Sequence, residues 1–179
     1  MRSKEELTHS LERYHTDFQE ELRFVTQFLE LLQSPRSFHR DHIPGHITAS
    51  AWIIDESKKQ TLLVHHAKLN RWLQPGGHAD GDENILNVAT REVNEETGLT
   101  DLTLLIPGIF DLDIHPIPAR KDFPEHLHYD IRFAFIASQN EELKISDESH
   151  DLKWVKLLKV PEITQQNSSI LRMIEKTRN

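Results

Sequence analysis

Residues 76–99 read GGHADGDENILNVATREVNEETGL, and this stretch decides how the rest of the chain is interpreted. It opens on paired glycines, has neither proline nor glycine from Glu83 to Thr97, and then meets Gly98. An uninterrupted run that stops at glycine is typical of a helix, because glycine readily adopts the left-handed conformation that ends one. The stretch therefore predicts a glycine-rich loop followed by a helix over 83–97.

Three acidic residues share one face of this predicted helix. With a turn of about 100° per residue, Glu92, Glu95 and Glu96 project in similar directions. The opposite face is apolar and carries Leu86, Ala89 and Val93. Repulsion among the carboxylates is tolerated when solvent covers them or when cations neutralise them. Clustered oxygens favour hard cations such as Mg²⁺, which bridge to phosphates, so a solvated helix face and a diphosphate site both remain open.

Composition excludes several classes of function. The chain has 179 residues, a formal net charge of −8, 12 histidines and no cysteine. An acidic chain is a poor match for the phosphate backbone of nucleic acids, although it can hold a small polyphosphate through metal ions. The absence of cysteine excludes disulfides, thiolate zinc sites and a cysteine nucleophile. No apolar run is long enough to cross a membrane, and no signal peptide is evident, so we expect a cytoplasmic protein without membrane or nucleic-acid partners.

Hydrophobic periodicity outlines the other elements. Apolar residues from Leu7 to Leu32 recur at spacings of three and four, which predicts one amphipathic helix or two short ones. Polar, histidine-rich residues 36–45 suggest a linker, and 163–177 suggest a closing helix. Strands are predicted at 46–54, 61–66, 102–106, 110–115, 128–137 and 152–155. We therefore expect an α/β fold with a mixed, curved sheet sandwiched by helices, divided into an N-terminal helical extension at 1–40 and a domain at 41–179.

The full spacing of the opening stretch resembles a family motif. The fixed positions are Gly77, Glu83, Arg91, Glu92, Val93, Glu95, Glu96, Gly98 and Leu99. They match the Nudix box, GX5EX7REUXEEXGU with U a bulky aliphatic residue. On this motif the chain is identified as a member of the Nudix hydrolase family, and the strand order over 42–160 is similar to that of the Nudix domain.

The resemblance implies roles for individual residues. Glu95 and Glu96 match the glutamates that bind essential divalent metals, Mg²⁺ with Mn²⁺ as a possibility. Glu92 matches a residue that is a ligand or a general base, and the carbonyl of Gly76 matches a frequent backbone ligand. Glu83 and Arg91 match a pair that buttresses the loop against the helix, and Gly77 and Gly98 are structural positions of the box.

Family members often recruit a further acid from a late loop. Glu148 is the candidate here, with Asp147 or Asp151 as alternatives and a solvated acidic loop as the plain interpretation. Such an acid would complete a second metal shell or accept the proton of the attacking water.

Several other polar residues are candidates for substrate contacts. His126, His128 and Asp130 alternate with apolar residues, so a strand would place them on one face; that face could bind a transition metal, contact substrate, or simply meet water. The loop that contains His115 ends in Arg120 and Lys121, and these cations, like Lys68 and Arg71, could pair with phosphate. Trp72 could stack on a base or pack beside Leu73.

Taken with the resemblance, these residues predict a metal-dependent hydrolase of phosphoanhydrides. The expected substrate is a nucleoside diphosphate linked to another moiety, of the ADP-ribose or nucleotide-sugar type. The alternatives are a pyrophosphatase that removes damaged nucleoside triphosphates and a non-catalytic module that binds a nucleotide. The long apolar stripe of the N-terminal helix must be covered by its own domain or a second subunit, and a homodimer is favoured.

Overall fold

The structure is a computed structural model, and it describes residues 3–178 of the chain. Over this range the helices are α1 (Lys4–Glu12), α2 (Gln19–Leu31), α3 (Ile85–Thr97), α4 (Val160–Ile163) and α5 (Ser168–Arg178). The strands are β1 (Gly45–Asp55), β2 (Gln60–His66), β3 (Arg71–Leu73), β4 (Gly76–His78), β5 (Thr103–Leu104), β6 (Asp111–Ile117), β7 (His126–Ala137) and β8 (Ser149–Lys156). The predicted strands and the helix of the opening stretch all occur, because their periodicity is local to each segment.

The described strands form a single hydrogen-bonded sheet of eight strands. Its order is β3-β2-β1-β7-β5, with β4 on β1, β6 on β7 and β8 on β2. Together with the helices, this confirms the predicted α/β class with a mixed, curved sheet and helices at the N-terminus. No helix within residues 3–178 is both long and apolar enough to span a bilayer.

The chain divides into two compact units, which are described separately. The first comprises Met1–Ser50, Gly77–Ala89 and Gly108–Phe133, and the second comprises Ala51–Gly76, Thr90–Pro107 and Ala134–Asn179. The predicted division into 1–40 and 41–179 stays a prediction.

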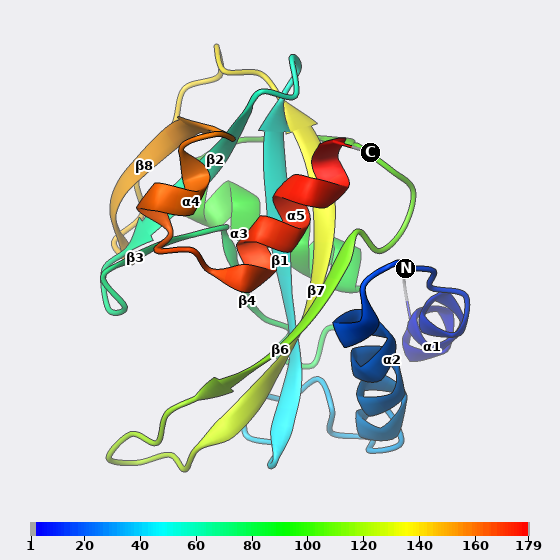
Figure 1. The fold of residues 1–179 in the computed structure, drawn as a ribbon. Coiled ribbons are helices and arrows are strands. Elements are labelled where there is room, and N and C mark those ends of the chain that lie inside the picture. The colour runs from blue at the N-terminus through cyan, green and yellow to red at the C-terminus, as the bar shows by residue number, and fades with distance from the viewer. Residues whose placement is uncertain (1–2, 179) are drawn as a thin grey trace. The chain divides into compact units, whose positions relative to one another are not determined.

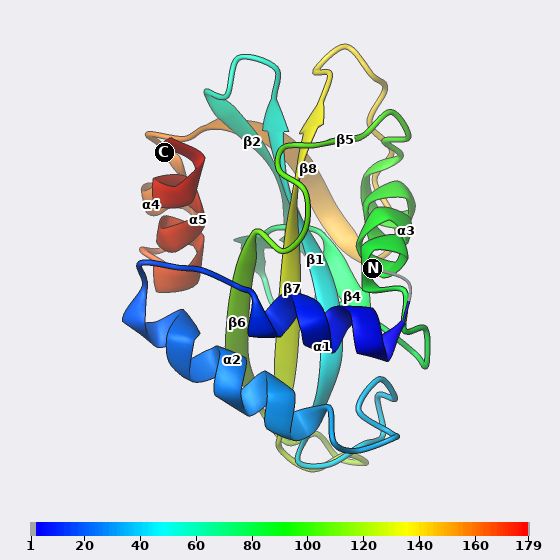
Figure 2. The same ribbon diagram turned by 90° about the vertical axis from the view of Figure 1, so that its right-hand side faces the viewer.

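In the first unit, α1 and α2 are tied to β6 and β7. Figure 2 shows both helices lying across these strands. Glu21 of α2 is fully buried, accepts a hydrogen bond of 2.7 Å from the Tyr14 hydroxyl, and accepts one of 2.9 Å from the Leu112 backbone N–H of β6. Leu7, Leu11, Phe28 and Leu32 of this segment are buried in the same unit, whereas Leu22 is 44% exposed. The four buried residues pack within their own chain, while the homodimer stays a prediction.

In the second unit, β2 is the central pairing strand. It pairs with β8 from Gln60↔Lys156 to His66↔Ser149 and with β3 through three residue pairs, Val64↔Leu73 to His66↔Arg71. Figures 1 and 2 place α4 and α5 on one face of this layer and α3 on the other. Helix α5 is held to β1 by a hydrogen bond of 2.9 Å from the Trp52 indole N–H to Thr177.

Two details differ from the sequence-based expectation. The closing helix predicted over 163–177 begins only at Ser168, because Gln165 and Gln166 have positive φ, and the short helix α4 before it was not predicted. The buried face of α3 carries Ile85 and Val88 with Ala89 and Val93, whereas Leu86 is only half-buried. The predicted apolar face is therefore rotated by about one residue, or roughly 100°, at its N-terminal end.

Candidate functional site

The acidic face of α3 lies in the second unit. Glu92 and Glu96 are half-buried and Glu95 is exposed. The Arg91 guanidinium is 2.8 Å from a Glu92 oxygen and 3.1 Å from a Glu95 oxygen, so one cation is shared between two of the carboxylates. The helix ends at Gly98, whose φ of +78° suits glycine, and a Cβ there would lie 3.0 Å from the Lys144 side chain.

The electrostatics of this face favour a cation. Burial, the charge of Glu92 and the charge of Glu148 raise the pKa of Glu96 to about 8, although a hydrogen bond from the Gly76 backbone opposes them. Burial, Glu95 and Glu148 likewise raise the pKa of Glu92, and Arg91 only partly offsets them. Such shifts arise where carboxylates are gathered with too little positive charge.

Glu148 belongs to the same group of charges. It immediately precedes β8, where its carbonyl accepts a hydrogen bond of 2.9 Å from Ala67. Its carboxylate acts on both Glu92 and Glu96, and the Lys68 ammonium lies 3.8 Å from it. The structure therefore brings the predicted late acid to the glutamates of α3. We call Glu92, Glu95, Glu96 and Glu148 the carboxylate cluster.

The donor set of the carboxylate cluster fits Mg²⁺ or Mn²⁺. Carboxylate oxygens are the ligands that hard divalent ions prefer, and Mg²⁺ needs only one or two of them beside its waters. The backbone of Gly76 is already at the side chain of Glu96. A divalent ion would supply the positive charge that the raised pKa values of Glu92 and Glu96 indicate is lacking.

The remaining box residues lie outside the carboxylate cluster. Gly77 lies in β4. Glu83 is exposed and accepts a hydrogen bond of 2.9 Å from the Lys4 backbone N–H in the first unit. The roles that the motif implies for Gly77, Glu83, Arg91 and Gly98 stay predictions.

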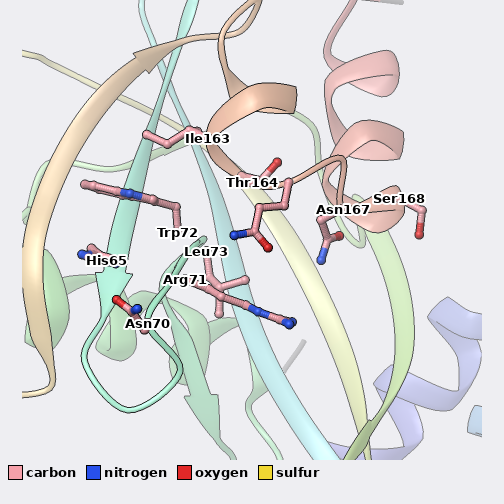
Figure 3. Close-up of a pocket in the computed structure, with 10 residues that line it drawn as sticks. His65, Asn70, Arg71, Trp72, Leu73, Ile163, Thr164, Asn167 and Ser168 are labelled. Atoms are coloured by element: carbon pink, nitrogen blue, oxygen red, sulfur yellow. The ribbon is translucent and has the colours of Figure 1, made fainter.

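Arg71 and Trp72 line a pocket on the other face of the second unit. The cavity has a volume of about 510 Å³ and is closed by the turn between α4 and α5 (Figure 3). The Trp72 ring stacks on His65 with centroids 4.9 Å apart and an angle of 13°. Arg71 and Trp72 come from β3, whereas the carboxylate cluster lies on α3 and directly before β8.

The predicted histidines converge in the first unit. His115, His126 and His128 lie together, with ring centroids 5.3 Å apart for His126 and His128 and 5.5 Å apart for His115 and His128. His46 of β1 and His78 of β4 join them, at 5.0 Å and 4.9 Å from His128. Of the three interpretations that the sequence left open for this strand face, contact with water does not fit His126 and Asp130, which are 9% and 4% exposed.

The two loop cations are placed differently. Arg120 and Lys121 are both exposed on the connection between β6 and β7. The charge of Arg120 acts on His78, so this cation lies near the histidines. Their predicted contact with phosphate remains a prediction.

Sequence reasoning missed a buried ion network in the same unit. Arg132 is 2% exposed and donates to Asp130 at 2.8 Å, Asp113 at 3.0 Å and Asp111 at 3.1 Å. Burial lowers the pKa of Arg132, but the three aspartates outweigh it and hold that pKa above its ordinary value. Asp130 also accepts hydrogen bonds from Thr48 and Ser50. The signal was present as charges at alternate positions of two predicted strands, 111 and 113 with 130 and 132.

Comparison with known proteins gives a consistent result. The model of the NUDIX domain family matches residues 44–176. The mouse bis(5'-nucleosyl)-tetraphosphatase (asymmetrical) is 29% identical over 113 residues, which cover 63% of this chain and 74% of the mouse protein. A solved structure of a C. elegans Ap4A hydrolase complex has a TM-score of 0.60 at 20% identity and covers 74% of this chain and 94% of its own.

A NUDIX family hydrolase from Clostridium perfringens has a TM-score of 0.59 at 24% identity, with 74% of this chain and 96% of its own covered. Both solved structures support the fold. The family match covers most of the chain and includes the complete box, which runs from Gly77 in β4 through α3 to Leu99, and we conclude that the chain belongs to the Nudix family of hydrolases, enzymes that act on phosphorus-containing acid anhydrides.

Proposed function

We propose that the chain is a metal-dependent hydrolase that cleaves a phosphoanhydride bond in a nucleoside diphosphate linked to a second moiety. The observation that carries this proposal is the carboxylate cluster, where burial and neighbouring charge raise the pKa of Glu92 and Glu96. A set of acids that is short of positive charge suits divalent ions, and divalent ions suit a diphosphate.

Each member of the cluster has a role in this proposal. Glu92, Glu95 and Glu96 hold the metal, with the Gly76 backbone beside them, and Arg91 fixes the orientation of Glu92 and Glu95. When bound, Mg²⁺ or Mn²⁺ supplies a water of lowered pKa and neutralises charge on the phosphoryl oxygens. Glu148 reaches the cluster from a separate element and accepts the proton of the attacking water or completes the ligand set.

The proposed substrate has a polar second moiety, of the ADP-ribose or nucleotide-sugar type. Arg71, His115, Arg120 and Lys121 offer hydrogen-bond donors or positive charge beyond what a bare diphosphate needs. The guanidinium groups of Arg71 and Arg120 can bind phosphate oxygens in two-point contacts, whereas the Lys121 ammonium acts as a point charge.

A second candidate is a dinucleoside tetraphosphate. The similarity to the mouse bis(5'-nucleosyl)-tetraphosphatase favours it, since that protein's name specifies two nucleosides joined through phosphates. Both candidates share the feature that distinguishes them from a simple triphosphate: the phosphate chain is substituted at both ends.

The test is a substrate panel assayed with Mg²⁺. We expect ADP-ribose, a nucleoside diphosphate sugar or a dinucleoside tetraphosphate to exceed every nucleoside triphosphate at least tenfold in kcat/KM, a difference of about 1.4 kcal/mol. The leading compound decides between the two candidates. A leading deoxynucleoside triphosphate that releases pyrophosphate would reject the conjugate proposal in favour of a pyrophosphatase that removes damaged nucleotides.

The carboxylate cluster is tested separately with Glu96→Gln. This variant keeps the size of the side chain and removes its charge, so kcat should fall by at least ~10²-fold. The matched control is Glu162→Gln, an exposed acid of α4 that pairs with Lys159. Turnover by Glu96→Gln at the level of the control would exclude the proposed role of Glu96. A wild-type protein that binds nucleotides but turns none of them over would indicate a non-catalytic module.

A further inference from the structure

Three histidines of the first unit form a compact triangle. They come from β1, β4 and β7, which the sheet order makes neighbours and which lie side by side in Figure 2. The ring centroids are 5.2 Å apart for His46 and His78, 5.0 Å for His46 and His128, and 4.9 Å for His78 and His128. One ligand nitrogen from each lies within 4.8 Å of the other two.

Two ring nitrogens of this triangle are buried without a hydrogen-bond partner. Among the described residues, the Nε2 atoms of His46 and His128 are buried and have no hydrogen-bond partner. His46 is 1% exposed, so water does not satisfy it from outside. Buried polar atoms are nearly always paired, and an orphaned one calls for an explanation such as an ion.

The tautomer of His46 leaves its Nε2 lone pair available. The Nδ1 of His46 is 3.4 Å from the carbonyl oxygen of His42, which can only accept, so Nδ1 carries the hydrogen. Metal-bound histidines are typically oriented in this manner, by a hydrogen bond from the second ring nitrogen to a carbonyl or carboxylate.

The spacing of the rings is that of a tetrahedral metal site. With metal–nitrogen bonds of about 2.1 Å, three coordinating nitrogens lie about 3.4 Å apart and their ring centres about 5 Å apart. The observed centroid distances of 4.9 to 5.2 Å match this arrangement. The ligand nitrogens lie within 4.8 Å of one another, so metal binding requires the rings to reorient toward a common centre.

The environment also keeps the rings ready to bind. Burial, followed by the charge of His78, lowers the pKa of His46 to about 4, and the same two causes lower the pKa of His128 to about 2. Neutral imidazole is the metal-binding form, so no proton has to be removed at neutral pH. Burial and the charge of Arg40 lower the pKa of His78, although Asp80 opposes them.

We propose that His46, His78 and His128 bind one divalent transition-metal ion of the Zn²⁺ type, with water at the fourth position. Three nitrogen ligands select such an ion over Mg²⁺, which prefers oxygen, so this site is chemically distinct from the carboxylate cluster. It assigns His128 to the metal in place of the substrate contact predicted from the sequence.

The experiment measures metal binding directly. Chelator-stripped protein is dialysed against Zn²⁺ in a large excess of Mg²⁺, and its zinc content and affinity are determined by elemental analysis and calorimetry. We expect one Zn²⁺ per wild-type chain and at least ~10²-fold weaker binding by His46→Ala and His128→Ala. His9→Ala, which removes an exposed histidine of the same unit, and Glu96→Gln should bind as the wild type does.

A second readout guards against misfolding of the His46 variant. Co²⁺ in the wild type should give the visible absorption of a tetrahedral site with nitrogen ligands, and Zn²⁺ should displace it. His128 is only half-buried, so its variant answers the question if His46→Ala does not fold. A wild type that takes up no stoichiometric Zn²⁺, or a folded His128→Ala that binds it equally well, would overturn the proposal and leave a packed histidine core.

Discussion

At the residue scale, Arg132 shows how strongly one side chain can depend on its neighbours. Its guanidinium is 3% exposed and faces Asp111, Asp113 and Asp130, which are 0%, 12% and 6% exposed. A buried cation with several hydrogen-bonded acids is costly to desolvate, but removing only the cation is worse, because it leaves like charges together in a poorly solvated site. This network shares β7 with the histidine triangle and links β7 to β6, where Asp111 pairs with Arg132 and Asp113 with Asp130 in the strand register.

Replacing this arginine should therefore destabilise the protein markedly. Arg132→Met is expected to lower the free energy of unfolding by about 3–5 kcal/mol, as measured by urea denaturation. Arg132→Lys keeps the charge but loses the forked geometry of the guanidinium. Its free energy of unfolding should therefore lie between those of Arg132→Met and the wild type.

The matched control is Arg36→Met. Arg36 pairs with Asp41, but both side chains are more than half exposed, at 56% and 62%. Exposed pairs contribute less than about 1 kcal/mol. If Arg36→Met and Arg132→Met lowered the free energy of unfolding equally, burial would not determine how much the Arg132 network stabilises the protein.

At the scale of elements, the turn between β1 and β2 depends on one carboxylate. Asp55 is 5% exposed and accepts hydrogen bonds from the backbone N–H groups of Lys59 at 2.8 Å and Gln60 at 2.7 Å, and from the Gln139 side chain at 3.1 Å. Burial raises the pKa of Asp55, but hydrogen bonds from Ser57, Gln60 and Lys59 outweigh it, so the pKa lies below its ordinary value of 3.8.

The sign of the pH dependence follows from this lowered pKa. As pH falls, Asp55 of the unfolded chain takes up a proton at a higher pH than Asp55 of the folded chain does. The stabilisation from the ionised carboxylate is therefore complete above pH 3.8 and is lost as pH falls through the lower pKa of the folded state. Asp55→Asn should therefore cost about 2 kcal/mol of unfolding free energy at pH 7, and the difference from the wild type should shrink below about pH 4.

Denaturation of both proteins by urea at several pH values measures this difference. Glu56→Gln serves as the control, since Glu56 is the adjacent acid in the same turn and is exposed. A gap between Asp55→Asn and the wild type that stays constant down to pH 3 would contradict the assignment to the ionised carboxylate.

Elements were predictable from the sequence where their signal is local. The helix over 83–97 and the long strands follow from spacing within each segment, and the carboxylate face of α3 follows from the same spacing. The histidine triangle was not predictable, because His46, His78 and His128 lie on three strands whose pairing the sequence does not give. When polar residues alternate along a strand, their face is expected to meet water unless another segment covers it. Here segments distant in the sequence cover that face, and the strand's own pattern does not reveal them.

Across the whole molecule, the family motif predicted the acids but not which elements carry the other candidate residues. Arg71 lines the pocket of the second unit, and His115, Arg120 and Lys121 belong to the first unit. The residues proposed for the chemistry lie on α3, directly before β8 and at the first residue of β4. The sequence alone does not show that Glu148 lies near Glu96, because the two are 52 positions apart. Glu148 is brought to Glu96 by the pairing of β8 with β2.

The carboxylate cluster should make the stability of the whole protein respond to divalent ions. A net charge of −8 already favours cation binding, and the raised pKa of Glu96, about 8, reflects burial and the repulsion that a bound ion would relieve. An ion that binds only the folded state stabilises it by about 2.7 kcal/mol at a concentration of 100 times its Kd. Chelator-stripped wild type given Mg²⁺ alone should therefore gain both turnover and a higher Tm.

The same reasoning predicts opposite effects of Glu96→Gln on stability and on activity. Without metal, the variant should be at least as stable as the wild type, because Gln replaces a carboxyl group whose ionisation is disfavoured by burial and by the neighbouring glutamates. With Mg²⁺, its Tm should rise less than that of the wild type, because it has lost a ligand, while its turnover stays low. Thermal denaturation of both proteins with chelator and with increasing Mg²⁺ measures each effect. Full turnover of the wild type in excess chelator, or a variant that is less stable than the wild type without metal, would show that the glutamates are held together by something other than a bound cation.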